Sequence, residues 1–269
     1  MKKIRLIIPY FGKLPKFFPY FLLTAKRNQK IDFLIYTDQN VDQLEILNAE
    51  NIEFKTLSFD DLRKKVQSKF DFEISLKTPY KLCDYKVAYG FIFEEELKGY
   101  DYWGFCDTDV LLGDIYQFLE EHSFFENDYA RYGLLGHLQI FKNSQEVNHV
   151  FMSGQGLNYR LDYHNVFTSE QNFIFDEAEG IQKLFEKSGF EQLQDKFFDD
   201  IDISHFSFRE YGEDEPKRYY SWSQKHGLKS INLVDGKIVI KHPLYTHFQK
   251  RKIECPEFEL VESFYVIPN

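Results

Sequence analysis

The first part of the chain alternates short apolar runs with segments whose apolar residues recur at helical spacing. The apolar runs cover residues 3–12, 31–38 and 51–58 and end in turn residues or polar residues. The first run is typical of a strand that is buried on both faces, and the other two also predict strands. Residues 17–26 and 41–50 have helical spacing, and Ser58, followed by two acids, predicts the N-cap of another helix. This alternation predicts an α/β fold with a mostly parallel central sheet flanked by helices.

The second part of the chain is less regular. Residues 81–97 and 144–152 favour helices, whereas residues 100–107, 128–133 and 138–143 favour strands. Asp235-Gly236 is a dipeptide favoured in hairpin turns and predicts a β-hairpin within residues 215–240. Residues 154–202 have no pattern that assigns them. Because neither a linker nor an internal repeat is visible, we interpret residues 1–269 as a single domain.

Composition narrows the possible partners. Aromatic residues make up 18% of the 269 residues, which favours an aromatic core or, alternatively, surfaces that stack on sugars or bases. The net charge of −10 and the absence of a long basic run argue against nucleic acid as a partner. The three cysteines fit neither a CxxC motif nor a disulfide framework, so a reducing cytoplasm is the simplest compartment.

The N-terminus and the length of the apolar runs indicate whether the sequence contains a signal peptide or a membrane-spanning segment. Ile4 to Ile8 is too short for the apolar part of a signal peptide, and Pro9 ends it. No apolar run approaches the roughly 20 residues of a membrane span. We therefore expect a cytoplasmic protein whose contact with a membrane, if it has one, is peripheral.

Polar residues follow three of the predicted strands, at residues 9–12, 37–38 and 106–109. In an open parallel sheet, ligands bind beyond the carboxyl ends of the strands. These three segments are far apart in the sequence, yet the predicted sheet would bring them to one edge. The pattern therefore predicts a ligand site there.

Asp107 and Asp109 are the most informative residues at this edge. Carboxylates at positions i and i+2 of an extended segment point to the same side and repel each other unless a cation lies between them. Oxygen ligands of this kind suit Mg²⁺ or Mn²⁺, which usually also bind substrate phosphates. The pair lies between "YWGFC" and "VLLGD", so it does not belong to a polar surface loop. The alternative is a capping or solvated role, which is the role we expect for Asp114.

An apolar strand that ends in DxD, after a first half of βαβαβ type, resembles GT-A glycosyltransferases. The segments "IIPYFGKLP", "SLKTPYKLCDYKVAYG", "GFCDTDVLLGDI", "GHLQIFKN" and "THFQKRK" together resemble a family of bacterial glycosyltransferase-like proteins of capsule and O-antigen loci. Several members of that family carry only an uncharacterised-domain label. The resemblance extends from Ile4 to about Lys252. It implies a GT-A-like fold, with a nucleotide-binding half at residues 1–110 and an acceptor-side half at residues 111–269.

The resemblance also implies roles for residues in the first half. The nucleotide would be held by residues of the first two strand ends: Pro9, Tyr10, Phe11, Gly12, Thr37 and Asp38. Tyr10 or Phe11 would stack on uracil, unless both pack under the first helix. Asp38 would accept a hydrogen bond from the base or the ribose.

The segment before the DxD strand adds Lys81, Asp84 and Lys86 to the donor site. Lys81 and Asp84 are three residues apart and share a helix face. Asp84 therefore either contacts the ribose of the nucleotide or pairs with Lys81 in the site. The alternative is a solvated salt bridge between Lys81 and Asp84 on the helix surface.

The metal would be bound by Asp107, Asp109 and His247, a histidine near the C-terminus. Lys250 and Arg251 follow it, and their charge would neutralise the leaving nucleoside diphosphate. Alternatively, this basic segment contacts anionic lipid headgroups. His242 is the weaker candidate ligand, because Pro243 follows it, which is typical of a residue that only ends a strand.

The acceptor side is less defined. His137 follows Gly136 just before a predicted strand and either contacts a sugar or is a satisfied buried histidine. An inverting transferase needs a carboxylate as general base. Asp176 is the first candidate and Glu177 the second, and the acid-rich segment with Asp199, Asp200 and Asp202 is a rival source. A retaining enzyme would need no such base.

Together these features predict an inverting, Mn²⁺- or Mg²⁺-dependent hexosyltransferase. It would move galactose or glucose from a UDP-sugar to a lipid-linked or oligosaccharide acceptor of a surface polysaccharide. The alternative is a non-catalytic module that binds nucleotide sugars or glycans. A nucleotidyltransferase is disfavoured because the first loop has only Gly12 where a glycine-rich phosphate loop would be needed.

Overall fold

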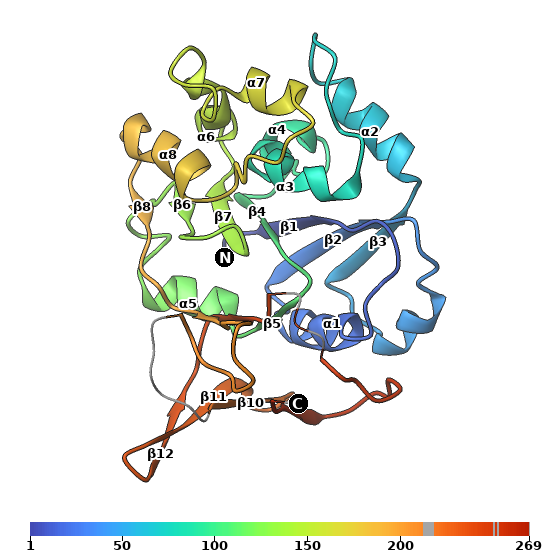
Figure 1. Cartoon of the computed structure of the whole chain (residues 1–269), viewed down its shortest axis with the longest axis vertical. Helices are drawn as coiled ribbons and strands as arrows, with labels where there is room; N and C mark the ends of the chain where they lie inside the picture. The colour runs from blue at the N-terminus through green and yellow to red at the C-terminus, as the bar shows by residue number, and fades with distance from the viewer. Residues whose placement is uncertain (212–217, 250, 252, 269) are drawn as a thin grey trace.

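A seven-stranded sheet forms the centre of the protein (Figure 1). The computed structural model describes residues 1–211, 218–249, 251 and 253–268. The strand order is β3-β2-β1-β4-β7-β6-β8. β7 runs antiparallel to both of its neighbours, and every other pair is parallel, which confirms the predicted sheet. The bounds are β1 (Ile4–Pro9), β2 (Ile31–Thr37), β3 (Ile52–Thr56), β4 (Tyr102–Cys106), β6 (Arg131–Tyr132), β7 (Leu138–Lys142) and β8 (Gln192–Leu193).

Helices cover both faces of this sheet (Figure 1). Side chains alternate along each strand, so Leu6 of β1 lies in one core with Phe18, whereas Ile7 lies in the other core with Leu62. One face carries α1 (Phe18–Arg27) and α5 (Ile115–Glu121). The other carries α2 (Phe59–Gln67), α3 (Leu82–Tyr85), α4 (Tyr89–Ile92), α6 (Gln145–Asn148), α7 (Tyr163–Thr168) and α8 (Lys183–Ser188). Burial on both faces explains the continuous apolar runs of the central strands.

The predicted helices differ in how well they form. Ser58 caps α2 as expected, because its hydroxyl accepts a hydrogen bond from the Asp61 backbone N–H at 3.1 Å. The segment 41–50 forms only a 3₁₀ helix, η1 (Asp42–Leu47). Residues 144–152 form α6 followed by η4 (Val150–Gly154). Within the region that the pattern left unassigned, the structure has α7, η5 (Ala178–Gln182), α8, β8 and β9 (Asp199–Asp200).

The single helix predicted over residues 81–97 is wrong. The segment is a series of short turns: η2 (Pro79–Lys81), α3, η3 (Lys86–Ala88) and α4. The backbone leaves helical geometry at Ala88, where φ is −101° and ψ is 4°. Tertiary contacts override the helical pattern here, because the ammonium groups of Lys81 and Lys86 are directed to distant buried partners, the Val166 carbonyl and the Asp176 carboxylate respectively. Gly90 is also required, since a Cβ there would lie 2.5 Å from the Trp103 ring.

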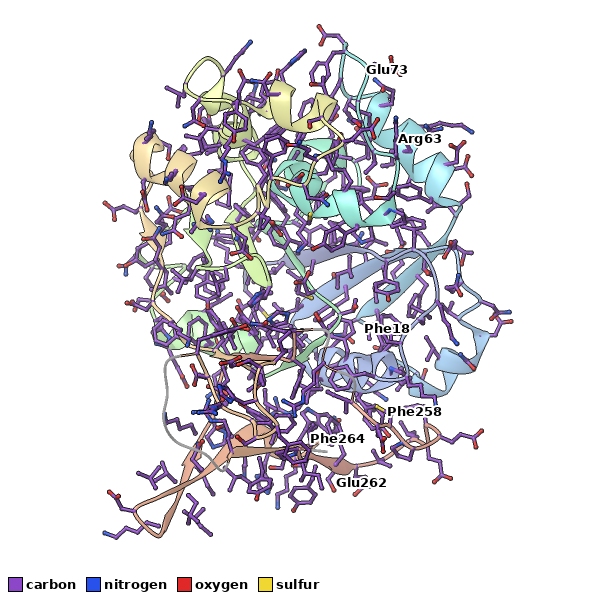
Figure 2. All side chains as sticks on the ribbon, viewed as in Figure 1. Phe18, Arg63, Glu73, Phe258, Glu262 and Phe264 are labelled. Atoms are coloured by element: carbon purple, nitrogen blue, oxygen red, sulfur yellow. The ribbon has the colours of Figure 1, made fainter. Side chains whose placement is uncertain are left out.

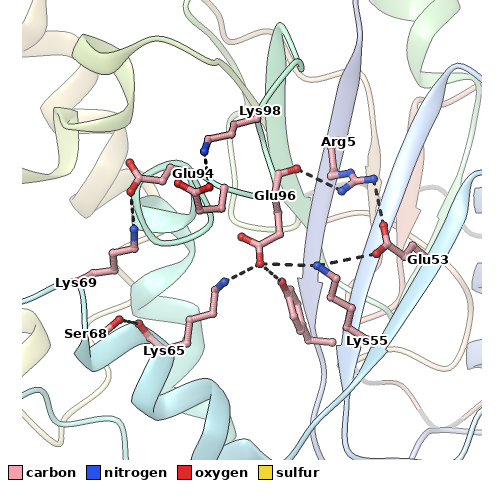
Figure 3. A network of polar contacts seen from close by, with 11 residues as sticks. Arg5, Glu53, Lys55, Lys65, Ser68, Lys69, Glu94, Glu96 and Lys98 are labelled. Atoms are coloured by element: carbon pink, nitrogen blue, oxygen red, sulfur yellow. Dashed lines mark hydrogen bonds and ion pairs between the residues drawn. The ribbon is translucent and has the colours of Figure 1, made fainter.

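A polar network holds α2 and the segment before β4 to the edge of the sheet (Figure 3). The Glu96 carboxylate accepts hydrogen bonds from the Tyr36 hydroxyl at 2.8 Å and from Lys65 Nζ at 2.6 Å. Arg5 of β1 donates to the Glu96 carbonyl and to the Glu53 carboxylate, both at 3.2 Å. Because Glu96 is mostly buried, these contacts resist solvent screening better than an exposed ion pair.

A four-stranded antiparallel sheet in the order β12-β11-β10-β14 lies beyond α1. Its strands are β10 (Arg218–Ser223), β11 (Gly227–Val234), β12 (Lys237–Lys241) and β14 (Ser263–Val266). Asp235 and Gly236 have φ values of 49° and 74° and form the two-residue turn between β11 and β12, which confirms the predicted hairpin. Figure 2 shows Phe264 and Phe258 beyond Phe18 of α1, and their rings contact Tyr20 of the same helix.

A three-stranded sheet joins these two parts of the structure. It consists of β5 (Val110–Leu112), β13 (Tyr245–His247) and β9, with β13 in the middle. Asp114 follows β5 and caps α5, because its carboxylate accepts a hydrogen bond from the Gln117 N–H at 3.1 Å. The supporting role expected for Asp114 is therefore confirmed. No helix in the described part of the chain is long and apolar enough to cross a membrane.

Candidate functional site

The two aspartates of the DxD motif lie where β4 ends. All five residues of β4 are buried, and the chain becomes partly exposed at Asp107 and Asp109. The Asp107 N–H donates to the His137 carbonyl at 2.8 Å, which extends the pairing of β4 with β7 by one residue. Both carboxylates therefore lie at the carboxyl edge of the parallel strands, where open α/β sheets bind ligands.

The three-stranded sheet brings His247 to the same place. In its register, His247 of β13 pairs with Val110 of β5 on one side and with Asp200 of β9 on the other. The His247 Nε2 atom lies 3.5 Å from Asp109 Oδ1. One ligand atom from each of Asp107, Asp109 and His247 lies within 4.8 Å of the others. We call these three residues the carboxylate–histidine cluster.

Asp200 orients His247 from behind. His247 Nδ1 donates to Asp200 Oδ1 at 2.9 Å, and Gln249 Nε2 donates to the same oxygen at 2.9 Å. This bond fixes the ring and directs Nε2 toward Asp109. A carboxylate behind a histidine is the usual support for a histidine that binds a metal. The sequence pointed to Asp200 only as a rival general base, because nothing in the local pattern shows which strand lies beside β13.

His137 adds a second imidazole. Its ring lies on the His247 ring with 3.6 Å between centroids. The buried His137 Nδ1 has no hydrogen-bond partner among the described residues. Burial, and then the charge of His247, lower the pKa of His137 to about 4. Burial also opposes charge on His247, but the carboxylates of Asp109 and Asp200 outweigh it and raise the pKa of His247 to about 9. His137 is thus neutral and His247 is protonated at neutral pH.

The donor atoms fit a divalent cation. The carboxylate–histidine cluster offers two carboxylates and one imidazole, a ligand set that suits Mn²⁺ and, less well, Mg²⁺. His137, Asp200 and His247 form a second group whose ligand atoms also lie within 4.8 Å of one another. The protonated His247 balances part of the negative charge of Asp109 and Asp200.

Lys86 is the other positive charge at the site. Its Nζ donates to Asp107 Oδ1 at 2.7 Å, to Asp176 Oδ2 at 2.9 Å and to the Gly136 carbonyl at 2.9 Å. Burial disfavours the charged amine, but Asp107 and Asp176 more than compensate and raise the pKa of Lys86 well above its usual range. Lys86 therefore stays charged and fixes one oxygen of Asp107.

Asp176 and Glu177 lie beside this lysine. A Cβ at Gly136 would lie 2.5 Å from Asp176 Oδ2 and 2.9 Å from Glu177 Oε1, so a glycine is needed between them and β7. Asp176 is buried, and burial raises its pKa to about 6. Glu177 is half-buried, and burial followed by the charge of Asp176 raises its pKa to about 7. Of the two predicted bases, Glu177 is thus the more accessible.

The ends of β1 and β2 meet as the sequence predicts. The Gly12 N–H donates to Asp38 Oδ1 at 3.0 Å, and Gly12 has the positive φ of 96° that glycine adopts easily. This bond, after one from Gln39, lowers the pKa of Asp38. Burial, and then the charge of Asp109, raise the pKa of Tyr10, so the Tyr10 hydroxyl lies close enough to the DxD motif to be affected by its charge.

The remaining predicted nucleotide residues differ in exposure. Pro9 ends β1 and is half-buried, whereas Thr37 is buried and accepts a hydrogen bond from the Gln39 N–H at 3.2 Å. Phe11 is buried and contacts Phe59 of α2, with 5.4 Å between ring centroids. Of the two aromatic candidates for stacking, Tyr10 is therefore the one that is partly exposed.

Lys81 and Asp84 form a buried pair instead of a solvated one. Lys81 Nζ donates to Asp84 Oδ2 at 2.7 Å and to the Val166 carbonyl at 2.9 Å. The Asp84 carboxylate also accepts hydrogen bonds from the backbone N–H groups of Phe173 and Phe175 at 3.0 Å. The pair thus holds residues 173–175, which precede Asp176. The side-chain nitrogen of Lys81 and the carboxylate of Asp84 both bind protein groups.

The basic C-terminal segment is only partly described. Lys250 lies outside the described residues, so its predicted role stays a prediction. Arg251 donates to the backbone carbonyls of His205 and Phe206, and its guanidinium lies over the Phe208 ring. His242 is exposed and belongs to neither histidine–carboxylate group.

The acids near β9 have separate partners. Asp199 accepts a hydrogen bond from the Tyr220 hydroxyl at 2.9 Å and lies 3.6 Å from Arg218 NH1. Asp202 accepts hydrogen bonds from the N–H and hydroxyl of Ser204. Asp200 is therefore the member of this acidic segment that reaches the site.

The model of a family of unknown function, DUF6625, matches residues 6–269. No curated protein matches the chain. Among solved structures, mouse xyloside xylosyltransferase 1 in its apo form is similar, with a TM-score of 0.44 and 10% identity over 93% of this chain and 98% of that one.

Two further structures show the same level of similarity. GlyE, a glycosyltransferase of Streptococcus pneumoniae, has a TM-score of 0.40 and 11% identity, covering 74% of this chain and 46% of that one. Core-mannan synthase A of Aspergillus fumigatus, in a form with Mn and GDP, has a TM-score of 0.37 and 9% identity, covering 71% and 70%. Because these TM-scores are below 0.5, the similarity assigns no function to the site.

Proposed function

Since the chain belongs to the DUF6625 family of unknown function, we propose a function from the site itself: metal-dependent transfer of a sugar from a nucleotide-sugar donor. The observation that carries this proposal is the carboxylate–histidine cluster at the carboxyl edge of the parallel strands. The loops after β1 and β2 lie at the same edge and are joined by the bond between Gly12 and Asp38. These features support a diphosphate bound at the cluster and a nucleoside bound beside it at the two loops.

We propose that the nucleoside lies against Tyr10. The partly exposed Tyr10 ring offers a stacking surface for the base. The Gly12 N–H orients the Asp38 carboxylate, which can accept a hydrogen bond from the base or the ribose. Bound Mn²⁺ or Mg²⁺ would neutralise charge on the diphosphate leaving group. The ligands for this ion are the carboxylate–histidine cluster, with His247 oriented by Asp200. We infer UDP as the nucleotide and a hexose as the sugar from the family resemblance of the sequence.

Activation of the acceptor is assigned to Glu177. A general base works best when its pKa lies near the working pH, and the pKa of Glu177 is raised to about 7. In an inverting transfer, Glu177 would take the proton of the acceptor hydroxyl as the oxygen attacks the anomeric carbon and the diphosphate leaves. Asp176 is buried against Lys86 and instead positions that lysine.

Thermal shift measurements with a panel of UDP- and GDP-sugars plus Mn²⁺ test this proposal. A bound donor stabilises the folded state by about 2.7 kcal/mol when its concentration is 100 times its dissociation constant. We expect one donor to raise the melting temperature in the presence of Mn²⁺ and to lose this effect in Asp109→Asn. Asp202→Asn is the matched control, because this carboxylate bonds Ser204 outside the cluster. An equal shift in Asp109→Asn, or no shift with any donor, contradicts the proposal.

A further inference from the structure

The β11–β12 hairpin projects from the body of the protein (Figure 1). One face of its sheet carries exposed apolar side chains. In the strand register, Leu233 pairs with Ile238, and Ile231 pairs with Ile240 and Tyr219, so all five side chains share one face. Ile238 is 71% exposed and Ile240 is 52% exposed. We call these five residues the hairpin face. The opposite face of the same sheet already packs on the core through residues such as Tyr220 and Trp222.

The strands around the hairpin face carry more basic than acidic side chains. Residues 218–241 contain four lysines outside the core, with Asp235 in the turn as the single acid: Lys225, Lys229, Lys237 and Lys241. Lys229 lies on the hairpin face beside Ser221. Lys237 and Lys241 stand at the two ends of the edge strand β12, where they pair with Val234 and Ser230 and therefore leave from the opposite face of the sheet. A chain with a net charge of −10 thus presents basic residues around its projecting apolar surface.

This combination fits an anionic lipid surface. Isoleucine and leucine side chains enter the boundary between headgroups and acyl chains, tyrosine is favoured at that level, and lysines bind the anionic headgroups. A second copy of the chain fits less well. If two β12 strands paired antiparallel about Val239, Lys237 of one copy would lie opposite Lys241 of the other, and lysines at an edge strand oppose such pairing.

The hairpin is also tied to the candidate site. Arg218 and Tyr220 of β10 contact Asp199 of β9, with the Tyr220 hydroxyl 2.9 Å from the Asp199 carboxylate. The next residue of β9 is Asp200, which orients His247. The sheet that carries the hairpin is therefore joined through buried contacts to the strand that supports the carboxylate–histidine cluster.

We propose that the hairpin face docks the protein on anionic lipid bilayers. Docking buries Leu233, Ile238 and Ile240 in the interface and places the lysines of the hairpin at the headgroups. If the proposed function also holds, docking presents the site to an acceptor carried by a lipid. Binding to lipid requires neither a donor nor a metal, so it is tested independently of the proposed function.

Co-sedimentation with vesicles tests the proposal. The full chain should bind vesicles of equimolar phosphatidylglycerol and phosphatidylcholine more tightly than vesicles of phosphatidylcholine alone, and high salt should weaken the binding. The double variant Ile238→Ser/Ile240→Ser should bind at least about tenfold more weakly, since both side chains lose apolar surface. Lys237→Gln/Lys241→Gln should lose about fivefold for each lysine on anionic vesicles only.

Leu157→Ser is the matched control, because Leu157 is an apolar side chain, half exposed, on a different loop. It should bind like the unaltered protein, and circular dichroism should show that every variant is folded. The proposal is overturned if the chain does not bind anionic vesicles or if the isoleucine variant binds equally well. Sedimentation velocity supplies a further outcome. A dimer that becomes monomeric in the isoleucine variant, without any binding to vesicles, would assign the face to a second copy.

Discussion

Binding of Mn²⁺ to the carboxylate–histidine cluster should release one proton from His247. Asp109 and Asp200 raise the pKa of His247 to about 9 although burial opposes the charge, so the imidazole is protonated at neutral pH. A metal can bind Nε2 only after this proton has left. Protons and Mn²⁺ therefore compete for the same ring, and the affinity for Mn²⁺ must depend on pH.

The size of this effect follows from the pKa. Below a pKa of about 9, each unit of pH changes the neutral fraction of His247 about tenfold, which corresponds to about 1.4 kcal/mol of binding free energy. The dissociation constant for Mn²⁺ should fall about 100-fold between roughly pH 6.5 and roughly pH 8.5 and level off near pH 9. Lys86 does not contribute, because its pKa stays far above this range.

Isothermal titration calorimetry in buffers of different ionisation enthalpy measures both the affinity and the number of protons released. Asp200→Asn removes one of the charges that raise the pKa of His247, so the affinity should level off at a lower pH. At high pH, loss of the oriented ring should weaken binding about 10- to 100-fold. Asp202→Asn should leave both quantities unchanged. An affinity that does not vary between these pH values, with no proton released, would refute the role of His247.

Three further substitutions test the surroundings of the cluster. Lys86→Met should lower the free energy of unfolding in urea by about 3–5 kcal/mol, because Asp107 and Asp176 lose their buried cation. A loss of less than about 1 kcal/mol would argue against a buried ion cluster. Gly136→Ala should cost about 1–3 kcal/mol in the same measurement, because its Cβ meets Asp176 Oδ2 at 2.5 Å. Transfer should rise with pH through about 7 as Glu177 loses its proton. Glu177→Gln should lower turnover about 10²- to 10⁴-fold and abolish the rise of turnover with pH. If turnover of this variant still rises through the same pH range, another residue is the base.

The first half of the fold was predictable because its signals are local. β1, β2 and β4 are mostly apolar runs bounded by turn residues, β3 alternates apolar and polar residues, and the hairpin turn at Asp235-Gly236 has the residues that its backbone requires. The position of Asp107 and Asp109 at the end of β4 also follows from the run that precedes them. That the chain is a single domain over residues 1–269 stays a prediction.

The rest of the site depends on contacts between distant segments. Nothing in the local sequence shows that β9 lies beside β13, so the support of His247 by Asp200 was not foreseen. The burial of Lys86 between Asp107 and Asp176 likewise depends on how the segment after η2 breaks into short turns. Such long-range pairing is fixed by the packed structure and leaves no periodicity in the sequence.

Release of nucleoside diphosphate from a UDP-sugar in the presence of Mn²⁺ tests the central claim most directly. The unaltered chain, supplied with a donor that stabilises it, should release UDP, and removal of the ion with a chelator should stop the release. Asp109→Asn should lower the rate by several orders of magnitude, whereas Asp202→Asn should not. Equal release by Asp109→Asn, or release that persists after chelation, would contradict a metal-dependent transferase built on the carboxylate–histidine cluster.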